Sequence, residues 1–329
     1  MKIAITGSLG LIGSSLIKEL REANIEIVAF DIRYNKQNPF YLDITNKDQL
    51  KQQLQDCDGV IHLAAIARVT WGEKNPVLCN LVNIDGIQNI IDTCLSSRKK
   101  PWLIFASSRE VYGTQDTLSP TLESATLSPL NTYAKTKLIG EQLIKEAHKK
   151  GLKAFIARFA NVYGGMFDHR DRVIPALTIN AIKNQDIEIK GKDTILDFIF
   201  IDDAVEALIK MINFLQEEKE KHLPIINIST SEAISLDKLV EIIVSATCST
   251  SNIISVLKDS FAVDQFCGSN SLARSILGWE PKFDLKQGTK KFIQSLNNKT
   301  KGHIDVNTIN MRLEEDESFK SYSWLPTEI

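Results

Sequence analysis

The sequence has no apolar run of the length needed to cross a membrane, which takes about 20 consecutive residues, so we expect no membrane-spanning helix. It also has no excess of charge of one sign. The 39 basic and 41 acidic side chains leave a formal charge of −2, whereas binders of nucleic acid or anionic membranes use clustered Lys and Arg. Hydrophobic residues make up 43% of the chain, too many for a disordered polymer. We expect a soluble, cytoplasmic, globular protein with neither nucleic acid nor membrane as a partner.

Cysteine and histidine are scarce and carry no recognisable spacing. The five cysteines are odd in number, scattered and never form a C-x-x-C pair, which argues against a disulfide framework or a zinc site. The five histidines show no H-x-x-x-H or H-E-x-x-H spacing, so nothing favours a metal centre. We expect the cysteines to be free thiols in the core: Cys57, Cys79, Cys94, Cys248 and Cys267.

The first half of the chain alternates short apolar runs with longer helical stretches. The apolar runs are nearly continuous and β-branched, as in strands buried on both faces. They predict strands at 2–6, 25–30, 58–64, 102–107 and 153–159. The predicted helices between them lie at 11–23, 46–55, 75–97 and 131–149. Alternation of this kind predicts an α/β fold in which helices cover both faces of a parallel sheet.

The pattern loosens after about residue 165. Further predicted elements are a helix at 173–184, a strand at 195–201, a helix at 203–219, a strand at 225–228 and a helix at 235–247. We expect residues 1–165 to form the main domain and 166–296 a smaller lobe, with segments near 195–228 returning to the main domain. Residues 297–329 form a polar extension with an acidic cluster at 314–317. This extension has no clear core face and is interpreted as either disordered or docked on a neighbour.

A glycine-rich turn joins the first predicted strand to the first helix. It reads Thr6-Gly7-Ser8-Leu9-Gly10-Leu11-Ile12-Gly13, with the spacing G-x-x-G-x-x-G. Glycines allow a tight turn and a close backbone approach, and the helix N-terminus offers free N–H groups and a positive dipole end to a pyrophosphate. Its place between a strand and a helix favours a dinucleotide-binding turn over an ordinary one.

Acidic residues follow the next two predicted strands. Asp31 lies about 20 residues beyond the turn, where a carboxylate can bind the adenosine ribose hydroxyls and repel a 2′-phosphate. This favours NAD over NADP, although Arg33 weakens the preference because it could pair with a phosphate. Asp43 follows a short third strand. It could meet the adenine amino group or cap the helix predicted near residue 46, and the sequence leaves both open.

Tyr133 and Lys137 form a Y-x-x-x-K pair on the helix predicted at 131–149, a spacing that places both side chains on one face. An ammonium near a phenol stabilises the phenolate and lowers its pKa, which makes the tyrosine an acid or base near neutral pH. The strand at 102–107 ends in Ser107-Ser108, where a hydroxyl could orient a substrate oxygen. Together with the glycine turn, these residues favour a functional set over a chance surface pair.

As a set, these residues resemble the extended short-chain dehydrogenases/reductases, in the branch of NAD-dependent nucleotide-sugar epimerases and dehydratases. The resemblance covers roughly residues 1–295. Further matching motifs are His62-Leu63-Ala64-Ala65, Asn83-x-x-Gly86, Ser107-Ser108-Arg109-Glu110-Val111-Tyr112-Gly113, Arg158-Phe159-x-Asn161-Val162-Tyr163-Gly164 and Leu277-Gly278-Trp279. The resemblance implies a Rossmann-type doubly wound parallel sheet with a smaller C-terminal α/β substrate lobe, NAD as cofactor and a nucleotide-diphosphate sugar as substrate.

The resemblance also implies roles for single residues. Tyr133 would be the catalytic acid/base, with Lys137 as its ribose-bound partner, and Ser108 would hold the sugar hydroxyl that is oxidised. Asn161 would face the substrate diphosphate or sugar. The residues that would contact the cofactor are Gly7, Gly10, Leu11, Ile12, Gly13, Asp31, Arg33, Asp43, Ile44, Leu63, Ala64, Ala65, Tyr133 and Lys137.

The residues after Ser108 bear on the type of reaction. Dehydratases of this family carry an Asp-Glu or Ser-Glu pair there, and this chain has Arg109-Glu110. Because Arg is always charged, Arg109 cannot donate the proton that water elimination needs. We therefore predict epimerisation through transient oxidation at C4. The alternatives are dehydration or decarboxylation with Glu110 as the base, and a catalytically silent NAD-binding regulatory protein. Glu110 could instead pair with Arg109.

Two places depart from the family pattern, and both help to hold the nucleotide diphosphate. Leu196 stands where an Arg often precedes Asp-Phe, and residues 265–270 lack the Arg usual before Leu-Gly-Trp. Arg170 and Arg172 could replace them, or could belong to an exposed charged loop. The family commonly dimerises through the helices at 75–97 and 131–149, which implies a homodimer. Apolar residues on these helices that fit an interface or a core are Val77, Leu81, Ile84, Leu138 and Leu143.

Overall fold

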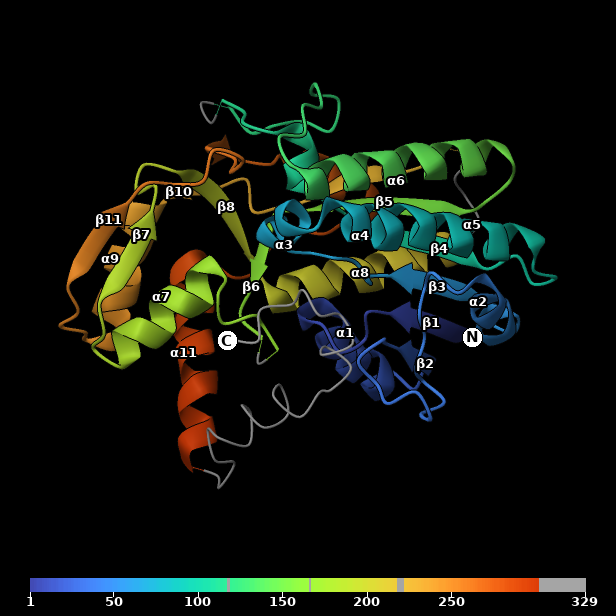
Figure 1. Cartoon of the computed structure of the whole chain (residues 1–329), viewed down its shortest axis with the longest axis horizontal. Helices are drawn as coiled ribbons and strands as arrows, with labels where there is room; N and C mark the ends of the chain where they lie inside the picture. The colour runs from blue at the N-terminus through green and yellow to red at the C-terminus, as the bar shows by residue number, and fades with distance from the viewer. Residues whose placement is uncertain (117–118, 166, 218–221, 302–329) are drawn as a thin grey trace.

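Six parallel strands form the central sheet of the protein, in the order β2-β1-β3-β4-β5-β9 (Figure 1). The structure is a computed structural model and describes residues 1–116, 119–165, 167–217 and 222–301. The strands of the sheet are β1 (Lys2–Thr6), β2 (Glu26–Phe30), β3 (Gly59–His62), β4 (Trp102–Ser108), β5 (Ala154–Phe159) and β9 (Ile225–Ile228). The five strands predicted in the first half of the chain are therefore confirmed.

Helices cover both faces of this sheet (Figure 1). On one face lie α1 (Leu11–Glu22) and α8 (Ile201–Gln216), and on the other lie α2 (Lys47–Leu54), α5 (Gly86–Ser96) and α6 (Thr132–Lys149). Strand β1 shows how the sequence supports both layers. Ile3 and Ile5 belong to the core with α1 and α8, and Ala4 belongs to the opposite core, because successive side chains of a strand alternate between faces. The predicted doubly wound α/β fold is confirmed.

The smaller lobe carries two short sheets (Figure 1). One has the order β10-β8-β12, with β6 also paired to β8, and the other pairs β11 with β7. Its strands are β6 (Asn161–Tyr163), β7 (Ile187–Lys190), β8 (Ile195–Phe200), β10 (Ala233–Ser235), β11 (Ile253–Val256) and β12 (Gln265–Phe266). Its helices are α7 (Val173–Ile182), α9 (Leu236–Thr247) and α11 (Leu285–Lys301), whereas α10 (Ser271–Leu277) packs against β9 and α8. Of the segment near 195–228, β8 lies in the lobe, whereas α8 and β9 lie on the main sheet.

The helix predicted at 75–97 is interrupted. After α3 (Val69–Lys74) the chain forms α4 (Pro76–Asn80), a π-helical turn η1 (Leu81–Asp85) and then α5. The buried Asn83 lies in this turn. Its Oδ1 accepts a hydrogen bond from Ile66 N at 2.8 Å, and its Nδ2 donates to Thr136 Oγ1 at 2.9 Å. These bonds attach the turn to the loop that follows β3 and to α6, and they stabilise the π-helical turn. Because they join distant residues, the sequence pattern does not reveal them.

Other differences are smaller. Instead of a third strand before Asp43, the chain has a single bridge between Asp31 and Tyr41. Helix α11 continues to Lys301, so the predicted polar extension begins as helix. Residues 302–329, with the acidic cluster at 314–317, lie outside the described residues, as do residues 218 and 219 of the predicted helix 203–219. The prediction of core cysteines is wrong for Cys248, which is exposed where α9 ends, and right for the other four.

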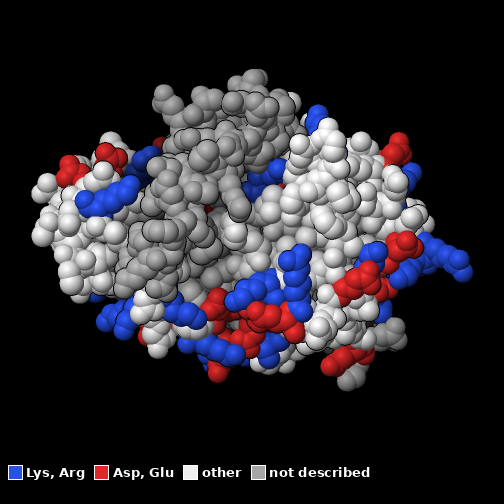
Figure 2. Space-filling view, turned by 90° about the horizontal axis from the view of Figure 1, so that it is seen from below, with Lys and Arg blue, Asp and Glu red and all other residues white. Residues whose placement is uncertain are grey.

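The surface is not sorted by charge on the face shown in Figure 2, where acidic and basic side chains are interspersed. Among the residues with described structure, no helix is long and apolar enough to cross a membrane. Within the same residues, no group of three or more His, Cys, Asp and Glu side chains is arranged to hold a metal ion.

Candidate active site

The glycine turn leaves the N-terminus of α1 open. Gly10 is the N-cap of α1 and contributes no side-chain cap. Gly7 has a φ of +75°, and a Cβ there would lie 2.7 Å from Ala64 N; a Cβ on Gly13 would lie 2.4 Å from Gly7 O. Side chains at these positions would therefore collide with backbone. The turn therefore packs closely against the backbone that follows β3, and α1 begins at a glycine without a capping side chain, a helix start that fits the phosphates of a dinucleotide.

Asp31 is buried at the end of β2 and is already paired. Its carboxylate accepts from Leu9 N at 2.9 Å and from the Arg33 side chain, with Nε at 3.0 Å and Nη2 at 3.1 Å. Arg33 therefore neutralises the carboxylate predicted to select NAD. Ribose hydroxyls that bind Asp31 would compete with Arg33 for the same oxygens, because a carboxylate offers about four acceptor sites.

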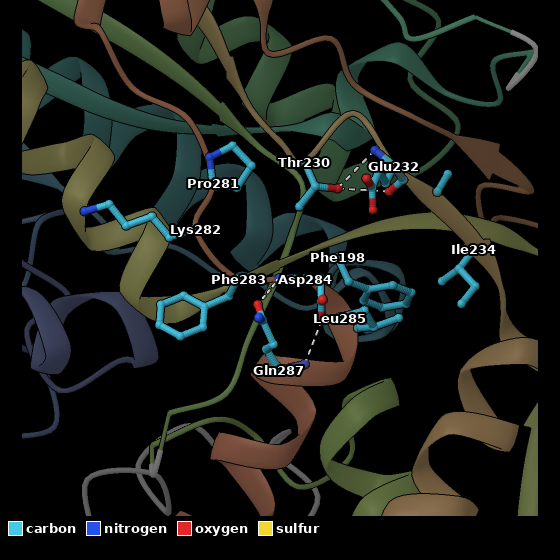
Figure 3. A pocket seen from close by; sticks show the side chains of 11 residues that line it. Phe198, Thr230, Glu232, Ile234, Pro281, Lys282, Phe283, Asp284, Leu285 and Gln287 are labelled. Atoms are coloured by element: carbon cyan, nitrogen blue, oxygen red, sulfur yellow. Dashed lines mark hydrogen bonds between the residues drawn. The ribbon is translucent and has the colours of Figure 1, made fainter.

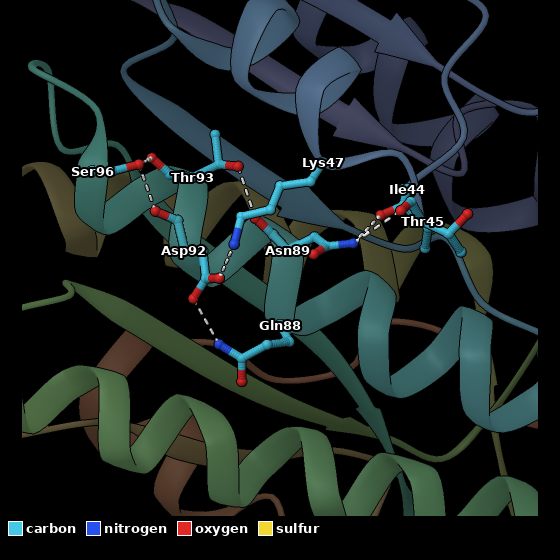
Figure 4. A network of polar contacts seen from close by, with 8 residues as sticks. All are labelled: Ile44, Thr45, Lys47, Gln88, Asn89, Asp92, Thr93 and Ser96. Carbon is cyan, nitrogen blue, oxygen red and sulfur yellow. Dashed lines mark hydrogen bonds and ion pairs between the residues drawn. The ribbon is translucent and has the colours of Figure 1, made fainter.

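Asp43 and Ile44 lie beside α5. Asp43 accepts from Thr45 N at 2.9 Å and from Thr45 Oγ1 at 2.7 Å, and the N-cap of α2 is Asn46. The alternative that Asp43 caps this helix is therefore wrong. Asn89 on α5 donates to the carbonyls of Ile44 and Thr45, and Lys47 pairs with Asp92 at 2.6 Å (Figure 4). These contacts fix the segment next to the glycine turn.

Ser108, Tyr133 and Lys137 come together at the end of β4. Ser108 is the last residue of β4, and its Oγ accepts from Glu110 N at 3.2 Å. Tyr133, in the first turn of α6, lies close enough to Ser108 for the serine hydroxyl to lower the pKa of its phenol. Lys137 is buried, donates to Ala106 O at 2.8 Å, and places Nζ 5.8 Å from the centre of the Tyr133 ring. A hydroxyl, a phenol and an ammonium thus meet in one place, as the sequence suggested.

The titration of this group differs from the sequence-based expectation. The pKa of Tyr133 is raised to about 12, chiefly by burial; the charge of Glu110 acts in the same direction, whereas Ser108 and Arg172 act in the opposite direction. Burial also lowers the pKa of Lys137 to about 8, because the ammonium loses its hydration. The expectation that Lys137 lowers the pKa of Tyr133 below its usual value is therefore wrong for the polypeptide by itself, in which the phenol keeps its proton.

Glu110 is held on both oxygens. Arg109 Nη2 lies 2.7 Å from Glu110 Oε1, and Asn131 Nδ2 donates to Oε2 at 2.9 Å. All three residues are buried. Of the alternatives left open for Glu110, the structure shows the pairing with Arg109, and a carboxylate with a donor on each oxygen has less freedom to accept a proton from a substrate.

The predicted substrate residues lie on β6 and in the segment that leads into α7. Asn161 accepts from Arg109 Nε at 3.3 Å and donates to Asp197 O at 2.8 Å. Arg172 pairs with Asp168 at 3.0 Å, and its charge reaches Tyr133. Arg170 is half-buried in the same loop. This loop is tied to α3 by an ion pair of Arg68 with Asp171 at 2.8 Å, so it lies against the main domain.

A buried network behind the site was not foreseen. Ser107 Oγ donates to Glu141 Oε1 at 2.6 Å, and Arg158 contacts both oxygens of Glu141 at 2.8 and 2.7 Å. Arg158 also donates to the Tyr112 hydroxyl at 2.9 Å. The two neighbouring serines therefore differ in role: Ser107 belongs to this network, and Ser108 faces Tyr133. Arg158 and Tyr112 belong to quoted motifs, but nothing in their spacing pointed to Glu141.

A separate cavity of about 450 Å³ lies in the smaller lobe (Figure 3). It is lined by Phe198 on β8, by residues 230–234 and by the segment 281–287 that leads into α11. Ser108, Tyr133 and Lys137 are not among its lining residues. The convergent residues at the end of β4 therefore remain the candidate active site.

Comparison with known proteins identifies the class. Residues 3–229 match the sequence profile of the NAD dependent epimerase/dehydratase family, and the chain belongs to this family. A Methanocaldococcus jannaschii protein, provisionally named a UDP-glucose 4-epimerase, is 30% identical over 310 residues, which are 90% of this chain and 98% of that one. The predicted family, the enzyme class and the cofactor NAD are thereby confirmed.

Two solved structures with bound NAD have the same fold as this chain. MoeE5 in complex with UDP-glucuronic acid and NAD has a TM-score of 0.82 at 25% identity, with 91% of this chain and 99% of that chain covered. The UDP-glucuronic acid 4-epimerase of Bacillus cereus, in complex with UDP-glucuronic acid and NAD, has a TM-score of 0.79 at 26% identity, with coverages of 90% and 100%.

Proposed function

We propose that this protein is an NAD-dependent 4-epimerase of a nucleotide-diphosphate sugar. The observation that carries the proposal is the meeting of the Ser108 hydroxyl, the Tyr133 phenol and the Lys137 ammonium at the end of β4. Relatives named as UDP-glucose and UDP-glucuronate 4-epimerases support the same reaction.

The residues of the turn would hold the cofactor. The N–H groups between Gly7 and Gly13 would bind the pyrophosphate, with Leu11 and Ile12 in the first turn of α1. Asp31 would bind the adenosine ribose, Asp43 and Ile44 would lie by the adenine, and Leu63, Ala64 and Ala65 would line the dinucleotide. Bound NAD would supply the hydride acceptor and donor for the hydrogen at C4 of the sugar.

The chain's own residues would move the proton. Ser108 orients the sugar C4 hydroxyl, and Tyr133 accepts its proton as the C–H bond breaks and the ketone forms. Tyr133 returns this proton to the oxygen when the ketone, turned over in the site, is reduced on its other face. Because burial favours the neutral phenol, the positive charge of Lys137 and Arg172 is needed to stabilise the phenolate.

Glu110 favours epimerisation over dehydration or decarboxylation. Those reactions would need Glu110 as a base, yet Arg109 and Asn131 occupy its two oxygens. Arg109 also stands where an acid would be required, and a guanidinium does not release a proton in a protein. On the substrate side, Asn161, Arg170 and Arg172 are the residues we assign to the sugar and the diphosphate.

We further propose a cytoplasmic homodimer. Val77 on α4 is 80% exposed, and Leu81 on η1 and Ile139 on α6 are also exposed, whereas Leu138 and Leu143 pack against the cores. Exposed apolar side chains on adjacent helices are typical of a subunit interface. Four buried free thiols fit a reducing compartment.

The test is turnover of defined sugars. Wild-type protein with NAD is incubated with UDP-glucose or UDP-glucuronate, and the C4 epimers are separated by chromatography. We expect epimerisation by the wild type, and a loss of at least about 100-fold in Tyr133→Phe, which lacks the phenolic proton. NAD binding without any turnover would instead support the regulatory alternative.

A further inference from the structure

Arg109 is a buried cation that is only partly paired. Its exposed fraction is 7%. Nη2 pairs with Glu110 at 2.7 Å and Nε donates to Asn161 at 3.3 Å. Its other terminal nitrogen, Nη1, is buried and has no hydrogen-bond partner anywhere in the described part of the chain. Buried donors of native proteins are nearly always satisfied, so an orphaned guanidinium nitrogen calls for an acceptor that the polypeptide does not supply.

The position of Arg109 defines where that acceptor comes from. Arg109 directly follows Ser108, whose hydroxyl meets Tyr133. Its guanidinium carbon also lies 5.9 Å from the centre of the Phe266 ring, on strand β12 of the smaller lobe. The side chain therefore bridges the reaction site and the lobe. A sugar whose C4 hydroxyl lies at Ser108 would place its C5 substituent, one ring atom away, next to Arg109.

The charge around Arg109 favours an acid on that substituent. Lys137 and Arg172 both lie near Tyr133, and Glu110 is the carboxylate that faces the same phenol. The Asp168 carboxylate lies 3.0 Å from the Arg172 guanidinium and offsets its positive charge. The pairing of Glu110 uses Nη2 of Arg109 only, so Nη1 keeps its donors. A guanidinium forms its strongest hydrogen bonds with an ionised acceptor, and a neutral hydroxymethyl group is a weaker partner.

We propose that Arg109 binds the carboxylate of a uronic acid, so that nucleotide-linked uronic acids are the preferred substrates of this enzyme. This inference rests on the proposed epimerase function, since it places the sugar by its C4 hydroxyl. The substrate's diphosphate is the other anion that could reach Arg109, and the test separates the two.

The test measures substrate preference in the holoenzyme. The ratio of kcat/KM for UDP-glucuronate to that for UDP-glucose is compared between wild type and Arg109→Met, which keeps the length of the side chain and removes its charge. We expect this ratio to fall about 100-fold. Arg109→Lys, which keeps the charge without the planar fork, should recover part of it. Arg274→Met removes a largely exposed arginine and should leave the ratio unchanged.

A binding measurement distinguishes a specific loss of UDP-glucuronate binding from the general loss that a misfolded variant would show. Because Arg109→Met leaves Glu110 unpaired, the double variant Arg109→Met with Glu110→Gln is titrated in parallel. Calorimetry on the NAD-loaded proteins, in a Tyr133→Phe background, gives affinities for UDP, UDP-glucose and UDP-glucuronate. We expect only the affinity for UDP-glucuronate to fall.

The outcomes separate this inference from the proposed function. An equal loss of affinity for UDP would assign Arg109 to the diphosphate and overturn the inference, as would a substrate preference that survives in Arg109→Met. A wild-type protein that binds UDP-glucuronate through Arg109 but epimerises neither sugar would refute the proposed reaction and leave the carboxylate site standing.

Discussion

At the scale of single residues, the proposed chemistry depends on the protonation states of Lys137 and Tyr133. Both side chains are buried, and burial disfavours the charged form of each. The polypeptide therefore stabilises a neutral pair at alkaline pH, although the proposed chemistry needs the ammonium. Binding of NAD through the ammonium must work against this tendency.

The lowered pKa of Lys137 predicts a pH dependence of cofactor binding. The pKa of Lys137 is lowered to about 8 in the protein alone, so the ammonium is lost as the pH rises through about 8. If NAD binds the charged form, its Kd should rise by up to about tenfold per pH unit between about pH 8 and 9.5. Tryptophan fluorescence titrations measure this Kd. In Lys137→Met the Kd should be higher and flat with pH; a flat wild-type profile would contradict the role of Lys137.

The residue patterns that could be predicted are local in sequence. Tyr133 and Lys137 are four residues apart on one helix, and the glycine turn is contiguous, so both were accessible without a structure. Arg33 and Asp31 are also near neighbours in the sequence. Their pairing could not be predicted, because an arginine can bind either a cofactor phosphate or a carboxylate. The raised pKa of Tyr133 could not be predicted, because burial is a property of the folded chain.

At the scale of elements, a buried ion pair holds the catalytic helix against the sheet. Glu141 on α6 lies one turn beyond Lys137, and its partners are Arg158 on β5 and Ser107 on β4. Both charged side chains are almost completely buried. The network therefore links the strand that ends in Ser108 with the helix that carries Tyr133. It joins residues far apart in the sequence, which is why spacing alone did not reveal it.

Glu141→Gln should destabilise the protein strongly. Arg158 would keep its charge in the core without a matching carboxylate, which costs about 3–5 kcal/mol in free energy of unfolding. Urea denaturation followed by circular dichroism measures the change. Glu146→Gln is the matched control, because Glu146 lies on the same helix and pairs with Lys149 in an exposed position. We expect less than about 1 kcal/mol there, and equal losses would show that the buried network is not special.

The main-sheet elements and the longer lobe elements α7, β8 and α9 were predictable, whereas the short strands of the lobe were not, for a physical reason. Strands of the main sheet are buried on both faces and read as continuous apolar runs. In β7 only alternate residues are buried, and β12 has only two residues, too little for a periodic signal. The turn η1 arises from the tertiary bonds of Asn83.

At the scale of the whole molecule, the exposed side chains on α4, η1 and α6 define the surface proposed for dimerisation. Val77 and Leu81 lie on adjacent turns, and Ile139 belongs to the neighbouring helix. The sequence marked the first two as apolar, but could not tell an interface from a core. Val77 and Leu81 are exposed in the folded chain, so they do not belong to the core and are available for an interface.

Val77→Asp should therefore disrupt the dimer. A carboxylate on each subunit would bring like charges into an apolar contact, and both lose hydration there. Sedimentation velocity should show a shift from dimer to monomer at micromolar concentration. Leu257→Asp, at a 96% exposed position in the lobe, should leave the oligomeric state unchanged. A wild-type monomer, or a dimer in both variants, would contradict the proposed interface.

The central claim is that hydride leaves C4 of the sugar and returns to the opposite face while Tyr133 carries the proton. The most direct test follows a deuterium label placed at C4 of UDP-glucuronate through one conversion by the NAD-loaded protein in ordinary water. The account predicts an epimerised product that retains deuterium at C4, because the label travels as hydride and never exchanges with solvent. An epimer in which the C4 deuterium is replaced by solvent hydrogen would contradict it.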